Sequence, residues 1–161
     1  MMLDPWLAAL EATTLAGALR DSTWVYPLVN AGHILGVALL VGSIIPLDLR
    51  LMGLWRSVPL APLWQVLTRS AAAGFALAVL FGALLFATRA TEYATSPFFI
   101  AKIAVVLAAV ANALALQRAI PDAASAGAAS GSYSWRVRAS AGFSLIAWLV
   151  ALILGRLLGY F

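Results

Sequence analysis

The only histidine of the chain, His33, lies in a stretch from Ser22 to Leu47 that has no charged side chain. This stretch is long enough to cross a bilayer, because about 20 helical residues span the roughly 30 Å hydrocarbon layer. An ionisable group at that depth is unfavourable unless a partner compensates it, so it is a candidate for function. An imidazole can ligate haem iron or another metal ion, and it can also carry a proton. His33 is therefore the first candidate ligand for a metal or a cofactor.

The residues around His33 fit either a cofactor or a neighbouring helix. Gly32 and Gly36 flank it and leave a surface without side chains beside the ring. Asn30 and Tyr26 lie about one and two helical turns earlier, on the same helix face. A porphyrin could lie on such a surface, but G-x-x-x-G spacing also serves helix packing. A neutral His33 that is hydrogen-bonded to Asn30, to Tyr26 or to a carbonyl group is the alternative.

Basic residues of the other apolar segments are expected at a depth similar to that of the histidine. Lys102, Arg89 and Arg156 each lie near a span end on the same side of the membrane. A b-type haem needs an axial imidazole, an apolar slot and cationic partners for its propionates. All three needs are represented, so the candidate cofactor is haem b. Alternatively, the cations extend to the lipid headgroups, and Arg89 pairs with Glu92 three residues later.

The composition is that of an integral membrane protein. Of 161 residues, 64% are hydrophobic and 10% are charged, whereas soluble domains have about 45–50% apolar and about 25% charged residues. The length fits a single domain, residues 1–161. The chain has no cysteine, which excludes disulfides, iron–sulfur clusters, thiolate zinc sites and covalently attached c-type haem. Its basic residues are dispersed rather than grouped, which predicts no nucleic-acid partner.

The hydrophobic segments predict an all-α fold, an integral membrane four-helix bundle in contact with the lipid bilayer. Each segment has about the length of a span and few charged residues. Asp4 and Pro5 fit an N-cap and a first helical position, which predicts an interfacial amphipathic helix over residues 1–21. The predicted spans are residues 24–47, 70–88, 98–116 and 139–160.

Further predictions concern the ends of the spans and the segments between them. Pro46 is expected to kink or end the first span. Residues 54–69, with prolines and tryptophans, are expected to form an interfacial linker. Residues 121–134, rich in alanine, serine and glycine, are expected to form a flexible loop. Asp48 and Arg50 are expected to pair at the membrane surface.

The distribution of arginines predicts the orientation of the chain. The two predicted loops on one side carry six of them, Arg50, Arg56, Arg69, Arg118, Arg136 and Arg138. Because cytoplasmic loops of membrane proteins are enriched in Lys and Arg, both loops are expected in the cytoplasm. The interpretation is a multi-pass protein of the bacterial inner membrane with both termini in the periplasm.

Several short motifs carry a resemblance to a known family. They are Trp24-x-Tyr26-Pro27, His33 with Gly36, Leu47-Asp48-Leu49-Arg50-Leu51-Met52-Gly53, Gly74-Phe75 with Gly82 and Phe86, and Ser96-Pro97-Phe98 with Lys102 and Asn112. Together they resemble a family of small bacterial four-span membrane proteins of unknown function, over nearly the whole chain. That family often has an acidic residue where this chain has Asn30, which argues against a proton relay at this position.

More distantly, the chain is similar to copper-resistance protein D and to the J-type haem-containing protoporphyrinogen oxidase. The shared pattern is a histidine in the first span, a glycine, Leu-x-x-Arg, and a lysine early in the third span. This resemblance implies a membrane four-helix core, a histidine that ligates b-type haem and a functionally important lysine. In this chain the implied roles fall on His33 and Lys102 only.

Three functions from different classes are open. The first is a b-type haem protein that transfers electrons between a periplasmic redox partner and the membrane, with quinone as one partner, or that serves a haem-linked oxidase. The second is a non-enzymatic accessory subunit of a larger membrane complex, and the third is a metal or small-anion permease. No catalytic triad or carboxylate pair is recognisable, so whether the chain is an enzyme is left undecided. Haem at His33 would be five-coordinate, or would take a sixth ligand from a partner or from a homodimer built on Gly32 and Gly36.

Overall fold

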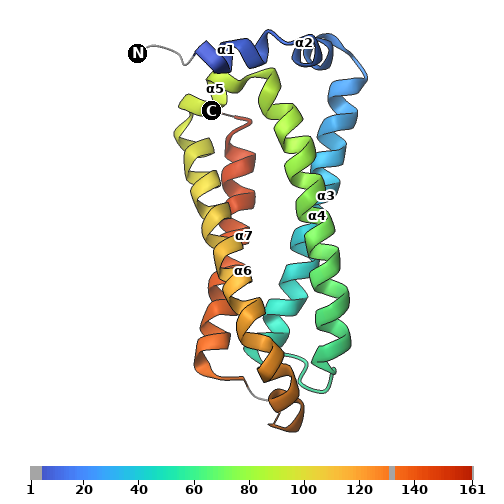
Figure 1. Ribbon diagram of the computed structural model, residues 1–161, viewed down its shortest axis with the longest axis vertical. Coiled ribbons are helices and arrows are strands. Elements are labelled where there is room, and N and C mark those ends of the chain that lie inside the picture. The colour runs from blue at the N-terminus through green and yellow to red at the C-terminus, as the bar shows by residue number, and fades with distance from the viewer. Residues whose placement is uncertain (1–4, 131–132, 161) are drawn as a thin grey trace.

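The computed structural model describes residues 5–130 and 133–160, and all regular structure within them is helical. Four long helices form a bundle, namely α3 (Val25–Met52), α4 (Leu60–Thr88), α6 (Pro97–Ser130) and α7 (Trp135–Leu157) (Figure 1). Each contains an apolar stretch long enough to cross a membrane, which in α6 is Pro97–Arg118. The predicted fold class, a multi-pass membrane four-helix bundle, is confirmed.

The bundle consists of two helix pairs. α3 packs along α4, α6 packs along α7, and the pairs are joined mainly through α3 and α7, whereas α4 and α6 touch only slightly. Three short helices, α1 (Pro5–Glu11), α2 (Thr14–Asp21) and α5 (Ala90–Thr95), lie at one end, where α7 also ends (Figure 1). We call this the capped end. The loop end is the opposite one, where α3 connects to α4 and α6 connects to α7.

The close approach of α3 and α4 depends on glycine at their crossing. A Cβ on Gly36 would lie 2.5 Å from the backbone nitrogen of Ala78. A Cβ on Gly74 would likewise lie 2.5 Å from the backbone nitrogen of Leu40. Small residues let two backbones pack directly against each other, and such packing is a main source of helix association in lipid. The crossing therefore fixes α3, and with it the histidine one turn away, against α4.

The N-terminal segment forms two short helices rather than the single one predicted over residues 1–21. Thr13 separates them and caps α2, because its hydroxyl accepts a hydrogen bond of 3.3 Å from the backbone N–H of Ala16. One apolar side of each helix is buried against the bundle. The N-cap predicted at Asp4 lies outside the described residues.

All four long helices extend further toward the loop end than the predicted spans. α3 continues through Pro46, since neighbouring groups in a membrane bundle compensate the hydrogen bond that a proline removes. α4 begins at Leu60, which corrects the linker predicted for residues 54–69. The prolines of this segment do not oppose the helix, because Pro59 precedes it and Pro62 lies in its first turn.

The flexible loop predicted for residues 121–134 is also corrected, since α6 continues to Ser130. Alanine dominates this part of the sequence and is the strongest helix former, so composition alone favours the helix. Residues 131–132 lie outside the described part of the chain. Only a short connection then leads into α7.

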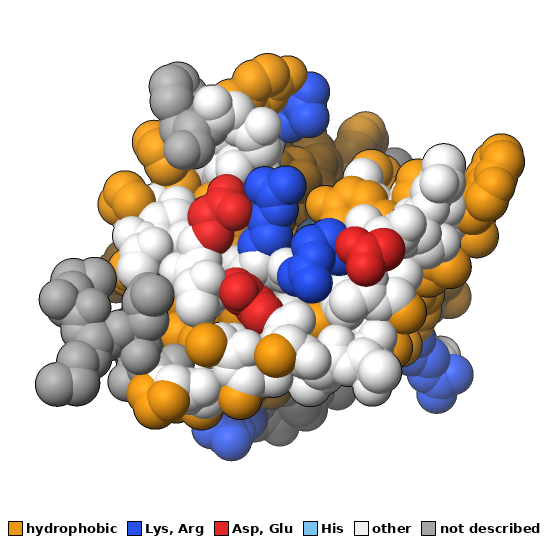
Figure 2. Space-filling view, turned by 90° about the horizontal axis from the view of Figure 1, so that it is seen from above, with side chains coloured by type: hydrophobic (Ala, Val, Ile, Leu, Met, Phe, Trp, Pro, Cys, Tyr) orange, Lys and Arg blue, Asp and Glu red, His pale blue; other side chains and the backbone are white. Residues whose placement is uncertain are grey.

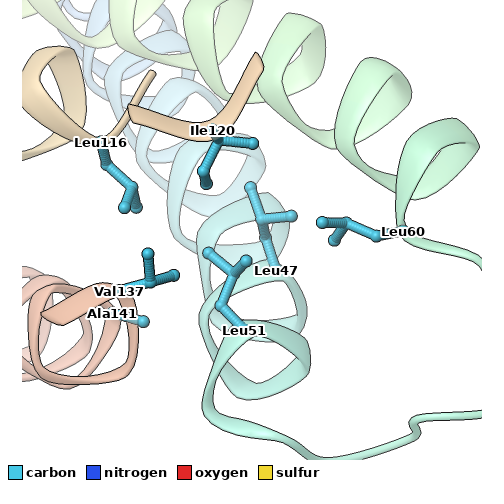
Figure 3. Close-up of a cluster of buried hydrophobic side chains, with 7 residues drawn as sticks. All are labelled: Leu47, Leu51, Leu60, Leu116, Ile120, Val137 and Ala141. Carbon is cyan, nitrogen blue, oxygen red and sulfur yellow. The ribbon is translucent and has the colours of Figure 1, made fainter. Parts of the chain in front are cut away.

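Two apolar clusters fill the bundle. The mid-bundle cluster joins α3, α6 and α7 around the indole of Trp148. The loop-end cluster takes side chains from all four long helices, and they point toward one another (Figure 3). The mid-bundle cluster comprises Leu40, Ala109, Ala147, Trp148 and Ala151, and the loop-end cluster comprises Leu47, Leu51, Leu60, Leu116, Ile120, Val137 and Ala141.

The predicted surface pair of Asp48 and Arg50 is wrong, because both side chains are buried and face different partners. Asp48 is hydrogen-bonded to the hydroxyl of Ser144 on α7. Arg50 donates from Nε to the carbonyl of Val58 at 2.9 Å and from Nη2 to that of Arg56 at 3.2 Å. Residues two positions apart point to different sides of a helix. Asp48 therefore faces α7, while Arg50 binds the carbonyls of the α3–α4 connection.

Candidate functional site

A cavity of about 290 Å³ lies at the capped end, and α3, α4, α5, α6 and α7 all contribute to its wall. It brings together five residues that the sequence predicted for a site, Tyr26, Asn30, His33, Lys102 and Arg156. The first three follow one face of α3, whereas Lys102 comes from α6 and Arg156 from α7. They meet because the chain crosses the bundle alternately, so the start of α3, the start of α6 and the end of α7 share one end.

The imidazole of His33 is held by a hydrogen bond to α4. Its Nδ1 lies 2.8 Å from the carbonyl oxygen of Ala78. A carbonyl oxygen can only accept, so Nδ1 carries the hydrogen and Nε2 of the neutral ring keeps its lone pair. Within the described residues Nε2 has no hydrogen bond. Metal-ligating histidines commonly donate their second ring N–H to such a partner, which orients the ring and raises the basicity of the ligating nitrogen.

Two glycines face the ionisable side chains of the cavity, and one of them, Gly82, leaves room that a larger residue would fill. A Cβ on Gly82 would lie 3.1 Å from Cε1 and 3.2 Å from Nδ1 of His33, which is tighter than ordinary van der Waals contact. A Cβ on Gly155 would lie 3.7 Å from Nζ of Lys102. A side chain at position 82 would therefore displace the ring that Ala78 holds. The sequence alone does not show which side chain each glycine faces, because this depends on which helices are neighbours.

Two cations line the cavity, and no carboxylate occurs among the described residues of its wall. Lys102 is half-buried and has no ion pair or hydrogen bond within the described chain. Arg156 is more exposed, and its guanidinium lies 4.7 Å from the ring centroid of Tyr160, to whose hydroxyl it also donates. Cations without a counter-charge favour a ligand that is anionic or accepts hydrogen bonds.

Three stacked aromatic rings form an apolar wall of the cavity. The rings of Phe86 and Phe99 lie 5.3 Å apart at an interplanar angle of 18°, and those of Phe99 and Tyr93 lie 5.8 Å apart at 23°. Burial raises the pKa of the Tyr93 hydroxyl above its ordinary value, so it stays neutral and can donate a hydrogen bond. Sequence reasoning missed these residues as a site, because aromatic side chains at a membrane boundary equally fit lipid contact.

The other predicted site residues lie outside the cavity. Arg89 pairs with Glu92 at 3.4 Å on the exposed surface, which is the alternative considered for it from the sequence. Gly36 faces the backbone of α4, and a Cβ on Gly32 would lie 2.7 Å from the ring of Phe81. The glycine surface is therefore covered by α4 of the same chain, and a homodimer built on it would have to displace that helix.

Polar contacts join the three short helices of the capped end, which we call the cap, to one another and to α4. Oε1 of Glu11 accepts hydrogen bonds from the hydroxyl and the backbone N–H of Thr91, at 2.6 and 2.7 Å. These bonds hold the pKa of Glu11 below its ordinary value of 4.5. Arg20 donates to the carbonyl of Thr88 at 3.3 Å. Figure 2 shows charged side chains gathered at the centre of this face.

Comparison of the chain with protein-family models, with curated proteins and with solved structures found no match. The resemblance carried by the sequence motifs thus gains no support from these comparisons, and haem ligation by His33 stays a prediction. No group of three or more His, Cys, Asp or Glu side chains that could hold a metal ion occurs in the described part of the chain. A metal ion at His33 would therefore need most of its ligands from a cofactor.

Proposed function

We propose that the cavity binds b-type haem and that the protein transfers electrons between a partner at the capped end and the membrane. One observation carries the proposal: His33, whose Nε2 has no hydrogen bond, lines the same cavity as the cations Lys102 and Arg156. Nε2 would be the axial ligand of the iron, and the two cations would pair with the propionates. This assigns a role to the imidazole, to the lysine that lacks a counter-ion and to the absence of carboxylates from the described wall.

The aromatic side chains of the cavity wall are suited to contact a flat apolar molecule. The stack of Phe86, Phe99 and Tyr93 offers an aromatic surface, against which a planar ring system can pack. The volume of about 290 Å³ is at the lower end of the roughly 300–1,000 Å³ of small-molecule sites. A second cavity, of about 320 Å³, adjoins it and shares Tyr93 and Leu158. A macrocycle would therefore require α4 and α6 to separate further, and these helices have few mutual contacts to lose.

Bound haem would supply one-electron chemistry, and the chain would set its ligation and surroundings. His33 would hold the iron from one side, while the cap would restrict water from the nearest end of the bundle. Because the Gly32 and Gly36 surface is covered by α4, we expect five-coordinate, high-spin haem in the monomer. A low-spin spectrum would require a sixth ligand from a partner subunit or from a dimer built on another surface.

The test is the visible absorption spectrum of the purified protein, before and after reconstitution with haem. Wild type is expected to show a Soret band, and His33→Gly is expected to lose it. Added imidazole can occupy the space of the missing ring and should restore the band, which separates loss of the ligand from misfolding. Leu28→Ala, on the exposed side of the same helix, is the matched control and should leave the band unchanged.

A folded wild type without a Soret band after reconstitution would contradict the proposal. The accessory-subunit alternative would then lead, because it requires no cofactor. A permease is less well supported, since the mid-bundle cluster around Trp148 and the loop-end cluster interrupt any polar row across the bundle.

A further inference from the structure

Asp48 is a carboxyl group buried inside the bundle, far from the cavity along the chain. Its exposure is 3%, although it lies only about one turn before the end of α3. The hydroxyl of Ser144 on α7 is hydrogen-bonded to its carboxyl group. Oδ2 is inaccessible to solvent and has no hydrogen-bond partner among the described residues. A group of this kind needs a physical explanation, because buried polar atoms are normally paired.

The surroundings of Asp48 include a short polar row. Ser144 and Ser140 lie one turn apart on the same face of α7. Oγ of Ser140 donates to Oδ1 of Asn112 at 2.7 Å, and Nδ2 of Asn112 donates to the carbonyl of Ser140 at 3.1 Å. Along α3, α6 and α7 the mid-bundle cluster lies toward the capped end from this row. The loop-end cluster overlaps the row, because Leu47 directly precedes Asp48 and Ala141 lies between Ser140 and Ser144.

No cation of the described part of the chain forms an ion pair with Asp48. Arg50 is turned to the carbonyls of Val58 and Arg56 instead. The ion pairs of the described chain, Arg20 with Asp21 and Arg89 with Glu92, both lie at the capped end. The side chain of Arg56 is exposed and donates to the carbonyl of Gly53 at 3.1 Å. The other basic side chains of the loop-end half are exposed at the surface of α4, α6 and α7, namely Arg69, Arg118, Arg136 and Arg138.

We propose that Asp48 is a proton-binding site inside the membrane, where it stands as a neutral carboxylic acid hydrogen-bonded to Ser144. A carboxylate that is buried without a cation is strongly unfavourable, and such a group takes up a proton instead. The proton would sit on the oxygen that lacks a protein partner, and the hydroxyl of Ser144 would serve the other oxygen. The ligand of this second site is the proton, and the site does not depend on what the cavity binds.

Infrared spectroscopy at neutral pH tests the proposal, in a detergent without ester carbonyls. A carboxylic acid has a C=O stretching band that an ionised carboxylate lacks. We expect this band in wild type and its loss in Asp48→Asn, whose amide has nearly the same shape as the neutral acid. Asp21→Asn is the matched control, because the Asp21 side chain is 80% exposed and should be ionised at neutral pH.

Ser144→Ala provides a second measurement that does not alter the carboxyl group itself. Loss of the hydrogen bond should shift the C=O band to higher wavenumber, and this holds even where Asp48→Asn fails to fold. Absence of the band in folded wild type would overturn the proposal, as would a band that persists in Asp48→Asn. A band unaffected by Ser144→Ala would overturn the assigned hydrogen-bond partner.

Discussion

Replacing Gly36 with alanine should force α3 away from α4. The added Cβ would lie 2.5 Å from the backbone nitrogen of Ala78 and 2.9 Å from the carbonyl oxygen of Gly74, whereas ordinary contact begins at 3.4 Å. The opposing atoms belong to the backbone, so no side-chain rotation can relieve the clash. Overpacking of this kind typically costs about 1–3 kcal/mol. The same movement should weaken the hydrogen bond between His33 and Ala78, because Ala78 is the residue displaced.

Thermal unfolding of the purified protein in detergent measures this cost. For a chain of this size a loss of 1 kcal/mol lowers Tm by about 2–4 °C, so a decrease of several degrees is expected. Gly42→Ala is the matched control, since nothing lies within 4 Å of a Cβ there. Alanine is better than glycine in a helix by about 0.5–1 kcal/mol, so the control should match or exceed wild type. Equal Tm values for the two variants would refute the proposed role of the Gly36 crossing.

Three further predictions can be checked on the same preparations. Lys102→Met should lower haem occupancy after reconstitution, because it removes a cavity cation, whereas Arg89→Met should not, because Arg89 lies outside the cavity and pairs with Glu92. Equal occupancy would remove Lys102 from the site. Since the folded-state pKa of Glu11 is depressed, its contact with Thr91 should stabilise the fold above about pH 4.5, and that stabilisation should be lost as pH falls through the lower folded-state value. Glu11→Gln should flatten this acid dependence of Tm, and an unchanged dependence would argue against the contact. Because the chain has no cysteine, single cysteines report topology directly, and an impermeant maleimide applied to intact cells should label Thr23→Cys but not Ser57→Cys. Labelling of Ser57→Cys alone would reverse the predicted orientation.

Much of the candidate site could be predicted from the sequence, because depth in a membrane follows from position in a span. Counting from the span ends places His33, Lys102 and Arg156 at the same end, and an antiparallel chain brings their helices together. Helical spacing adds Tyr26 and Asn30 to the face of His33. Five polar members of the cavity were therefore accessible without a structure, whereas Tyr93 was not.

The rotation of each helix about its axis could not be predicted in the same way. Beyond the short face that carries His33, the apolar side chains of α3 are spread around its circumference, so their pattern does not distinguish lipid from the bundle interior. For that reason Gly36 fitted a cofactor surface or a helix crossing equally well, and Asp48 fitted a surface pair although it turns toward α7. The same ambiguity hid Phe86 and Phe99, whose role in the cavity depends on which side faces inward.

The two proposed sites lie in opposite halves of the bundle, and the mid-bundle cluster separates them. Between the cavity and the row that holds Asp48, α3 carries the buried hydroxyl of Ser43, but this hydroxyl donates to the carbonyl of Leu39 on its own helix at 2.7 Å. Within the described residues no chain of hydrogen bonds therefore joins Asp48 to His33, and each site would exchange protons with its own end of the bundle. Coupling between them would have to be electrostatic, since charge acts over longer range in an apolar interior than in water. Such coupling needs no moving helix, which fits a bundle whose two best-packed helices are locked at Gly36 and Gly74.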